Sequence, residues 1–241
     1  MKRFYKAATI EADGDGFVIR LDGRAVRTPA RALLLLPTRA LAEAVAAEWA
    51  AQEANVRPDT MPLTRLANTA IDRVAARRGE VIDEVAAFGG SDLLCYRTAE
   101  PDVLAARQDD VWTPFLDWAR DRLGAPLAVT RGIMPVRQSE ASLAALRGEV
   151  AVLDTFRLTA LHALVHGFGS LVLGLAALHR IAALDDLWAA SRLDETFQAE
   201  EWGIDDEAAA LALLHRADVE AAARLLSLLA GDGDEDTNLH I

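Results

Sequence analysis

The stretch EWAAQEANVRPDTMPLTRLANTAID, residues 48–72, lies where a strand-rich part of the chain gives way to a helical part. The end of one helix, marked by Trp49, runs into an extended segment that contains Pro58, and a second apolar-patterned segment opens at Pro62. Proline is tolerated at the first position of a helix but not in its interior, so this order predicts helix, linker and helix. The stretch holds many side chains able to make specific contacts but no set that forms a reaction centre, which favours a binding protein over an enzyme.

Short strands are predicted before this stretch, over residues 1–36. The turn signals Asp13–Gly16 and Asp22–Gly23 flank the alternating run FVIRL. Asp-Gly between short runs of this kind indicates a hairpin, because glycine accepts a positive φ. Two or three more short strands fit within Arg24–Leu36. Thr38 then precedes apolar residues at helical spacing, and its hydroxyl is suited to cap that helix.

From about residue 73 the strand signals vanish and helical patterns take over. The sequence therefore predicts an α+β protein: a small β-rich domain with one or two helices over residues 1–72, a larger all-helical domain over residues 73–231, and an acidic disordered tail over residues 232–241. The predicted helices of the second domain are Arg77–Phe88, Pro101–Arg122, Ser139–Ala151, Asp154–Ala182, Leu184–Trp202 and Asp205–Leu229.

The negative charge of the chain is placed unevenly. The net charge is −12, and residues 185–241 alone hold 15 acidic and 3 basic residues. A negative surface repels nucleic acid phosphates and anionic membranes, so a basic or mixed protein partner is favoured. A solvated helix face followed by a disordered tail explains the same residues without any partner. The first ten residues have no apolar run of signal-peptide length, so a cytoplasmic location is expected.

The segment Leu158–His179 contains no Asp, Glu, Lys or Arg, and its length could span a bilayer. Its histidines and glycines dilute the hydrophobicity, and the flanking patterns are amphipathic, so we interpret it as the buried central helix of the helical domain. Gly167, Gly169 and Gly174 have the wrong spacing for a nucleotide-binding loop, and no strand precedes them. Close packing between helices is therefore predicted at these glycines.

His162 and His166 stand four residues apart in HALVH, a spacing that places both on one helix face. This spacing can bind zinc, but the metalloprotease motif needs Glu directly after the first histidine, and Ala163 stands there. Hydrogen-bonded core histidines are the favoured interpretation, with no metal or other cofactor; a metal-dependent hydrolase using this pair is the alternative function. Cys95 is the single cysteine, so an internal disulfide is excluded, and a small buried core residue is predicted rather than a nucleophile.

The run LDETFQAEEW, residues 193–202, holds four carboxylates within eight residues. They could hold a metal or meet arginines of another protein, but a solvated helix face is the simplest explanation. Trp202 ends the run directly after Glu201, where acidic residues oppose the dipole of the helix. This unfavourable placement is a sign of a partner.

Several blocks of the chain occur together in a fixed order: RFYK, LDGRAVRTP, LPTRALAEAVAAEWAAQ, MPLTRLANTAID, SDLLCYR, WTPFLDW and LDETFQAEEWG. In this order and spacing they resemble the assembly chaperones of the ATP synthase catalytic headpiece, which bind its alpha subunit. The resemblance extends from Arg3 to about Leu229. No presequence is visible, which resembles the bacterial members; the eukaryotic relatives act in the mitochondrial matrix.

The resemblance implies a β-rich domain joined to a helical domain and a protein that is not an enzyme. Its members hold the free alpha subunit and cover the surface later buried against the beta subunit, until beta displaces them. The expected partner is therefore the alpha subunit, with no nucleic acid, no stable membrane insertion and no cofactor. A monomer is expected.

Residue by residue, the resemblance implies two groups of functional positions. The family's important acidic position falls on Glu195, ahead of an aromatic-Gln pair, and its Trp-Gly pair ends the same run. After Gly203 the chain departs from the eukaryotic members, because IDDEAAA lacks their His-Asp pair. The predicted partner-binding residues are Glu195, Asp194, Phe197, Gln198, Glu201 and Trp202. The predicted structural residues at the domain junction are Glu48, Trp49, Gln52, Pro62, Thr64 and Asp72.

Overall fold

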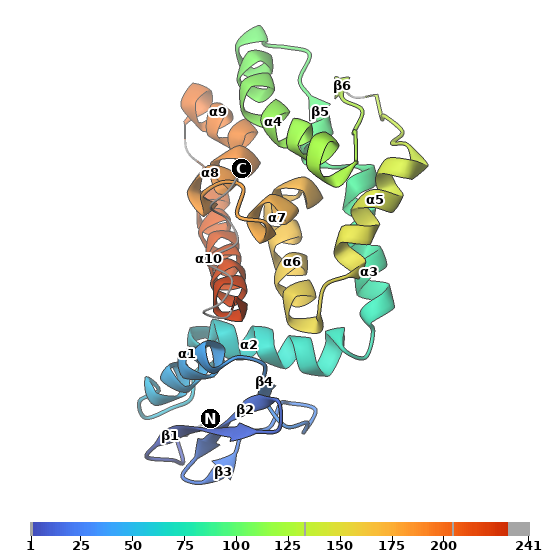
Figure 1. Ribbon diagram of the computed structural model, residues 1–241. Coiled ribbons are helices and arrows are strands. Elements are labelled where there is room, and N and C mark those ends of the chain that lie inside the picture. The colour runs from blue at the N-terminus through green and yellow to red at the C-terminus, as the bar shows by residue number, and fades with distance from the viewer. Residues whose placement is uncertain (1, 133, 204, 231–241) are drawn as a thin grey trace. The chain divides into compact units, whose positions relative to one another are not determined.

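The computed structural model describes residues 2–132, 134–203 and 205–230, and the chain begins with an antiparallel sheet (Figure 1). The central strand, Gly16–Leu21, pairs with the other three strands. In its pairing with the first strand, Ala8 lies opposite Leu21 and Asp13 lies opposite Gly16. The predicted turn at Asp22 is present, with positive φ at Asp22 and at the glycine after it. The strands are β1 (Ala8–Asp13), β2 (Gly16–Leu21), β3 (Arg24–Ala25) and β4 (Leu35–Leu36).

Two helices follow the sheet, as the sequence predicts. α1 (Arg39–Ala50) begins where the Thr38 hydroxyl accepts a hydrogen bond from the Leu41 amide at 3.2 Å. Its buried face packs on β1 and β2. A 3₁₀ turn, Pro58–Thr60, then leads to α2 (Pro62–Thr69), which begins at the proline and continues into a π-helical turn, Ala70–Val74.

The rest of the chain is mainly helical, so the α+β fold class is confirmed (Figure 1). The expectation that no strand follows residue 73 is wrong. Tyr96 pairs with Thr130 and Arg97 with Arg131 in a parallel bridge of two short strands, and two residues are too few to produce an alternating pattern. The helices and strands of this part of the chain are α3 (Arg78–Ala87), β5 (Tyr96–Arg97), α4 (Asp102–Leu123), β6 (Thr130–Arg131), α5 (Glu140–Ala151), α6 (Thr155–Phe168), α7 (Leu171–Leu178), α8 (Leu184–Ser191), α9 (Leu193–Trp202) and α10 (Asp206–Leu229), with 3₁₀ turns at Phe88–Gly90 and Leu93–Cys95.

Two helices predicted as continuous are each divided in two. The apolar segment breaks between α6 and α7, where Gly169 has φ +69° and the Ser170 hydroxyl accepts from the Leu173 amide at 3.0 Å. The following pattern breaks at Arg192, between α8 and α9. Among the described residues, none of the helices combines the length and the apolar character that a bilayer crossing requires.

Glycines allow α6 to pack closely against its neighbours, as predicted. A methyl group added at Gly167 would overlap the Val219 side chain of α10. One added at Gly174 would lie 2.6 Å from a methyl carbon of Val165. A methyl group added at Gly169 would meet no described atom within 4 Å. Gly169 instead supplies the left-handed backbone conformation that ends α6.

The contacts of the chain divide it into two compact units. The first unit gathers residues 2–78, 154–160 and 221–230, and the second gathers the described residues of 79–153 and 161–220. In the first unit the Thr38 hydroxyl also donates to the Leu228 carbonyl at 2.7 Å, which ties the end of α10 to the start of α1. The domains expected from the sequence, 1–72 and 73–231, stay a prediction, and the expected tail at 232–241 lies outside the described residues.

Candidate functional site

The exposed side of α9 carries most of the residues predicted to bind a partner. Glu195, Gln198 and Trp202 are spaced three and four residues apart, so they lie on one side of the helix. All three are exposed, as is Glu201, and the Trp202 side chain is 79% exposed. We call these four residues, Glu195, Gln198, Glu201 and Trp202, the acidic face of α9. It offers carboxylates, an amide and a large aromatic ring within two helical turns.

Asp194, Phe197 and Glu200 anchor α9 to α4 within the second unit. The Gln108 side-chain amide donates to an Asp194 carboxylate oxygen at 2.7 Å. Phe197 is buried, and the Arg107 guanidinium lies 5.4 Å from the centre of its ring. Arg107 also donates to Glu200 at 2.8 Å. Asp194 and Phe197 thus position the acidic face of α9, and a direct contact of either with a partner stays a prediction.

Glu195 is an exposed carboxylate for which a partner role is predicted from the family. It lies in the first turn of α9, where a negative charge is favoured by the helix dipole. Its carboxylate pairs with Arg192 at 3.0 Å, and the Glu195 side chain is 55% exposed. An exposed pair of this kind is weak, so the carboxylate can exchange Arg192 for a cation of another protein.

An open groove of about 360 Å³ lies between α4, α8 and α9. Thr196, the neighbour of Glu195, is part of its wall. The groove was missed from the sequence, although Val111 and Phe115 stand at the i,i+4 spacing of an apolar helix face. The lining residues are Arg107, Val111, Phe115, Asp186, Ala189, Ala190, Leu193 and Thr196.

The predicted junction residues form a hydrogen-bonded network inside the first unit. The Glu48 carboxylate of α1 accepts from the Leu63 and Thr64 amides at 2.8 Å each and from the Thr64 hydroxyl at 2.7 Å. Glu48 therefore satisfies two backbone donors in the first turn of α2, which have no partner within the helix. The Gln52 side chain donates to the Glu48 carbonyl at 3.0 Å and to the Thr60 hydroxyl at 3.1 Å.

Trp49 and Asp72 tie further parts of the first unit together. The Tyr5 hydroxyl donates to the Trp49 carbonyl at 2.6 Å, and the two rings meet edge to face with centres 5.8 Å apart. Asp72 accepts from the Thr28 hydroxyl at 2.6 Å and from the Ala30 amide at 2.9 Å. Asp72 therefore holds the loop between β3 and β4 against the helical turn that continues α2.

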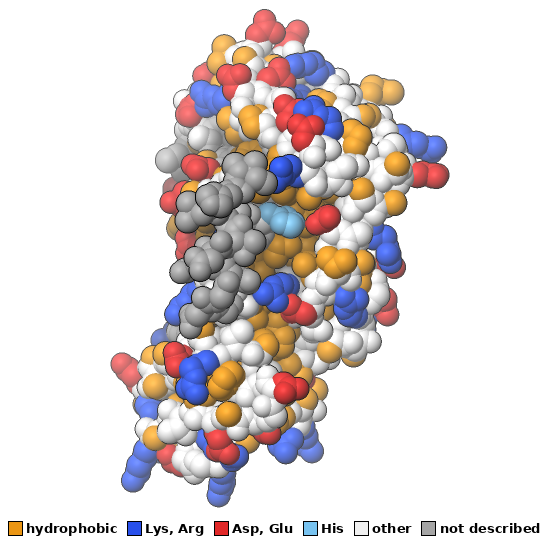
Figure 2. Space-filling model, viewed as in Figure 1, with side chains coloured by type: hydrophobic (Ala, Val, Ile, Leu, Met, Phe, Trp, Pro, Cys, Tyr) orange, Lys and Arg blue, Asp and Glu red, His pale blue; other side chains and the backbone are white. Residues whose placement is uncertain are grey.

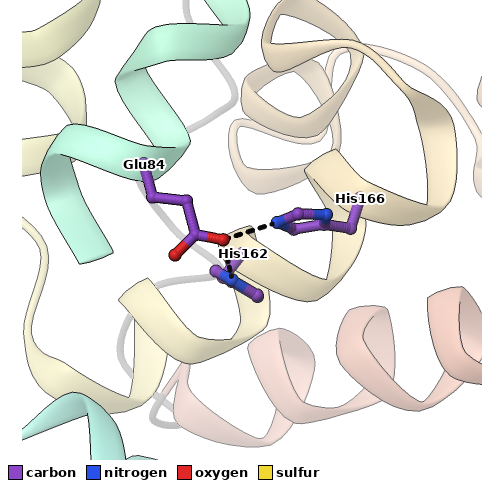
Figure 3. Close-up of side chains that lie close together, drawn as sticks. All are labelled: Glu84, His162 and His166. Carbon is purple, nitrogen blue, oxygen red and sulfur yellow. Dashed lines mark hydrogen bonds and ion pairs between the residues drawn. The ribbon is translucent and has the colours of Figure 1, made fainter. Parts of the chain in front are cut away.

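Three side chains of the second unit converge in a second candidate site (Figure 3). The Nε2 atoms of His162 and His166 lie 3.4 and 3.3 Å from the same Glu84 carboxylate oxygen. The expectation of core histidines is wrong, because both side chains are partly exposed and the pair faces α3. Burial, together with the neighbouring charge of His166, lowers the pKa of His162. These are residues that could hold a metal ion.

Cys95 is a buried core residue, as predicted. Burial raises the pKa of its thiol to about 12, and the nearby Asp92 carboxylate adds to this rise. Since the thiolate is the nucleophilic form, this cysteine is unreactive at neutral pH.

Solved structures match this fold along nearly the whole chain. Atp12 from Paracoccus denitrificans is 44% identical with a TM-score of 0.92, and the match covers 94% of this chain and 97% of that one. A point mutant of the same protein matches equally well. A protein from Agrobacterium tumefaciens is 41% identical with a TM-score of 0.91, covering 95% of this chain and 86% of that one.

The sequence comparisons agree with the structural ones and define the class of protein as a chaperone. The mitochondrial protein atp12 of Schizosaccharomyces pombe is 23% identical over 257 residues, which cover 99% of this chain and 86% of that one. The family described as ATP12 chaperone protein matches residues 2–120. The chain belongs to the ATP12 chaperone family.

Family membership confirms the resemblance seen in the sequence and makes the chain an ATP synthase assembly chaperone. It gives no support to the metal-dependent hydrolase considered as the alternative.

Proposed function

We propose that this chaperone binds the unassembled alpha subunit of ATP synthase through the acidic face of α9. In the bound state it covers the alpha surface that later meets the beta subunit, and so prevents aggregation until the headpiece forms. It acts as a monomer in the bacterial cytoplasm, with no catalytic step. The observation that supports this most is the clustering of Glu195, Gln198 and Trp202 on one exposed helix side.

The chemistry of this side suits a surface that is both apolar and basic. An unassembled subunit exposes a large apolar interface, which is an aggregation hazard. Trp202 can bury its ring in such an interface, as aromatic anchors do in protein complexes. The carboxylates of Glu195 and Glu201 beside it select basic side chains on the partner, because matching charges orient and speed association.

The groove beside α9 extends the same surface with an apolar pocket. Val111 and Phe115 supply apolar walls, and Arg107 and Asp186 supply one charge of each sign. A volume of about 360 Å³ accommodates one or two side chains of a partner. The partner therefore places an apolar side chain in the groove and a cation at Glu195, while Trp202 covers a further apolar area.

The alpha subunit can pass from the chaperone to the beta subunit only if the chaperone binds alpha with moderate affinity. Glu195 is exposed, so its charge contributes modestly and is screened by salt. A partner that competes for the same alpha surface can then displace the chaperone. Binding should accordingly weaken as the ionic strength rises.

A titration of the alpha subunit with charge-reversal variants tests both the partner and the site. Glu195→Lys places a like charge opposite the basic side chains of alpha, and we expect the Kd to rise at least about tenfold, equivalent to about 1.4 kcal/mol. Glu43→Lys is a matched control, because Glu43 is 59% exposed and pairs with Arg39 across one turn of α1. It should leave the Kd within about twofold of the unmodified protein.

Failure of the unmodified protein to bind a folded alpha subunit would overturn the proposed function itself. Equal losses in Glu195→Lys and Glu43→Lys would leave alpha binding in place but remove α9 as its site. Circular dichroism of both variants shows that the helices are intact before the affinities are compared.

A further inference from the structure

Glu84, His162 and His166 converge on one point from two helices. The histidines lie one turn apart on α6, and Glu84 reaches them from α3 (Figure 3). Both Nε2 atoms approach the same carboxylate oxygen, at 3.4 and 3.3 Å, and the ligand atoms of all three residues lie within 4.8 Å of one another. Strong N–H···O hydrogen bonds are shorter, at about 2.9 Å. The three groups are therefore close together without a direct contact of optimal length.

The two separations between histidine nitrogen and carboxylate oxygen are those that a shared metal ion produces. In tetrahedral zinc sites the bonds to histidine nitrogen and carboxylate oxygen are about 2.0–2.2 Å, so two ligand atoms lie about 3.3–3.5 Å apart. The observed separations of 3.4 and 3.3 Å fall in this range. We propose that Glu84, His162 and His166 form a binding site for a divalent transition-metal ion of the zinc class.

The ligand set decides which ions fit. Two imidazoles and one carboxylate suit Zn²⁺, Co²⁺ and Ni²⁺, whereas Mg²⁺ and Ca²⁺ prefer oxygen ligands only. Imidazole must be neutral to bind a metal, so the affinity should fall as the histidines become protonated. Three protein ligands leave a further coordination position for water or for a side chain of another protein.

The surroundings of the site hold the ligands in place while leaving them accessible. The ring of Phe88 meets the ring of His166 edge to face, with centres 5.0 Å apart. The side chains of His162, His166 and Glu84 are 34%, 44% and 53% exposed, so an ion can enter from solvent. Figure 2 shows one face of the molecule, on which hydrophobic side chains lie between acidic and basic ones.

Metal binding would join α3 to α6 inside the second unit. Because the ion binds the folded arrangement and not the unfolded chain, it should raise the stability of this unit. This inference does not depend on the proposed binding of the alpha subunit, and it assigns no hydrolytic step to the ion.

Titration of the metal-free protein with Zn²⁺ and Co²⁺ tests the site. We expect one ion per chain, and a Co²⁺ absorption spectrum of tetrahedral type. His162→Gln, His166→Gln and Glu84→Gln should each weaken Zn²⁺ binding by at least about tenfold. Mutation of residues that only support a metal ligand already lowers metal affinity by about tenfold or more. Thermal unfolding should shift upward with Zn²⁺ in the unmodified protein and not in His162→Gln.

His179 provides a matched control for the titration. It pairs with Glu149 at 3.4 Å and its side chain is 40% exposed, so it offers the same kind of pair without a second histidine. His179→Gln should leave the affinity unchanged. Binding that does not saturate at one ion per chain, or that weakens as much in His179→Gln as in His162→Gln, would show general attraction to surface histidines and overturn the site.

Discussion

Asp92 is a fully buried carboxylate whose replacement should strongly destabilise the second unit. One of its oxygens accepts from the Ser170 hydroxyl at 2.7 Å and from the Leu94 amide at 3.1 Å, and the other accepts from the Val172 amide at 3.0 Å. It therefore connects the 3₁₀ turn before β5 to the first turn of α7. Burial raises the pKa of this carboxyl, and the hydrogen bonds that it accepts oppose the rise.

The magnitude follows from the donors that would lose their acceptor. Asp92→Ala removes the acceptor of the Ser170 hydroxyl and of the Leu94 and Val172 amides. The two amides alone, left unpaired in the core at about 1–3 kcal/mol each, should lower the free energy of unfolding by about 2–6 kcal/mol. Asp92→Asn retains one carbonyl oxygen but places an amide group opposite the Val172 donor. Only that bond is lost, and the fall should be about 1–3 kcal/mol.

Urea unfolding followed by circular dichroism and tryptophan fluorescence measures both values. Asp110→Ala, at an exposed position of α4, is the surface control and should change the free energy of unfolding by less than about 0.5 kcal/mol. If Asp92→Ala changed it no more than Asp110→Ala, the hydrogen bonds assigned to Asp92 would not stabilise the fold. An Asp92→Asn variant less stable than Asp92→Ala would contradict the ranking.

Three further predictions follow from contacts within the two units. Gly167→Ala should lower the free energy of unfolding by about 1–3 kcal/mol, because the added methyl group overlaps α10. Gly148→Ala, at an open position of α5, should instead raise it by about 0.4–1 kcal/mol. Shifts of the same sign in urea unfolding would refute the overlap. Glu48→Ala removes the carboxylate that accepts from the first-turn amides of α2, so the free energy of unfolding should fall by about 0.5–2 kcal/mol. Hydrogen exchange of those amides should also become faster. Unchanged exchange would count against the capping role of Glu48. The pKa of His162 is lowered in the fold, so the unfolded chain takes up a proton first as the pH falls through about 6.5. The free energy of unfolding should therefore decrease in this pH range, and His162→Gln should remove that part of the decrease. An identical dependence of the free energy of unfolding on pH in His162→Gln would be contrary to this assignment.

Local sequence signals were sufficient for most of the fold. Turn chemistry at Asp22 and the hydroxyl of Thr38 predicted the second hairpin turn and the start of α1, because both act over a few residues. The break between α6 and α7 was missed because Gly169 was interpreted as a packing residue, whereas it ends α6 and Ser170 caps α7. The parallel bridge of β5 and β6 was also missed, because its pairing depends on residues 34 positions apart in the chain.

The candidate sites show the same limit. The partner-binding role of the acidic residues of α9 was predicted from the family resemblance and not from their spacing. The burial of Phe197 depends on packing against α4, where the Arg107 guanidinium lies near its ring. The histidine pair was visible as an i,i+4 motif, whereas Glu84 precedes His162 by 78 residues and carries no local signal. Residues that act together across helices are brought together by packing, which short patterns do not record.

The most direct test of the proposed function is displacement by the beta subunit. Separately expressed, folded alpha subunit is bound to this chaperone, the pair is isolated, and beta is added in increasing amounts. We predict a stable pair from which beta releases the chaperone as alpha and beta associate. A ternary complex that retains the chaperone would contradict the claim that it covers the beta-facing surface of alpha.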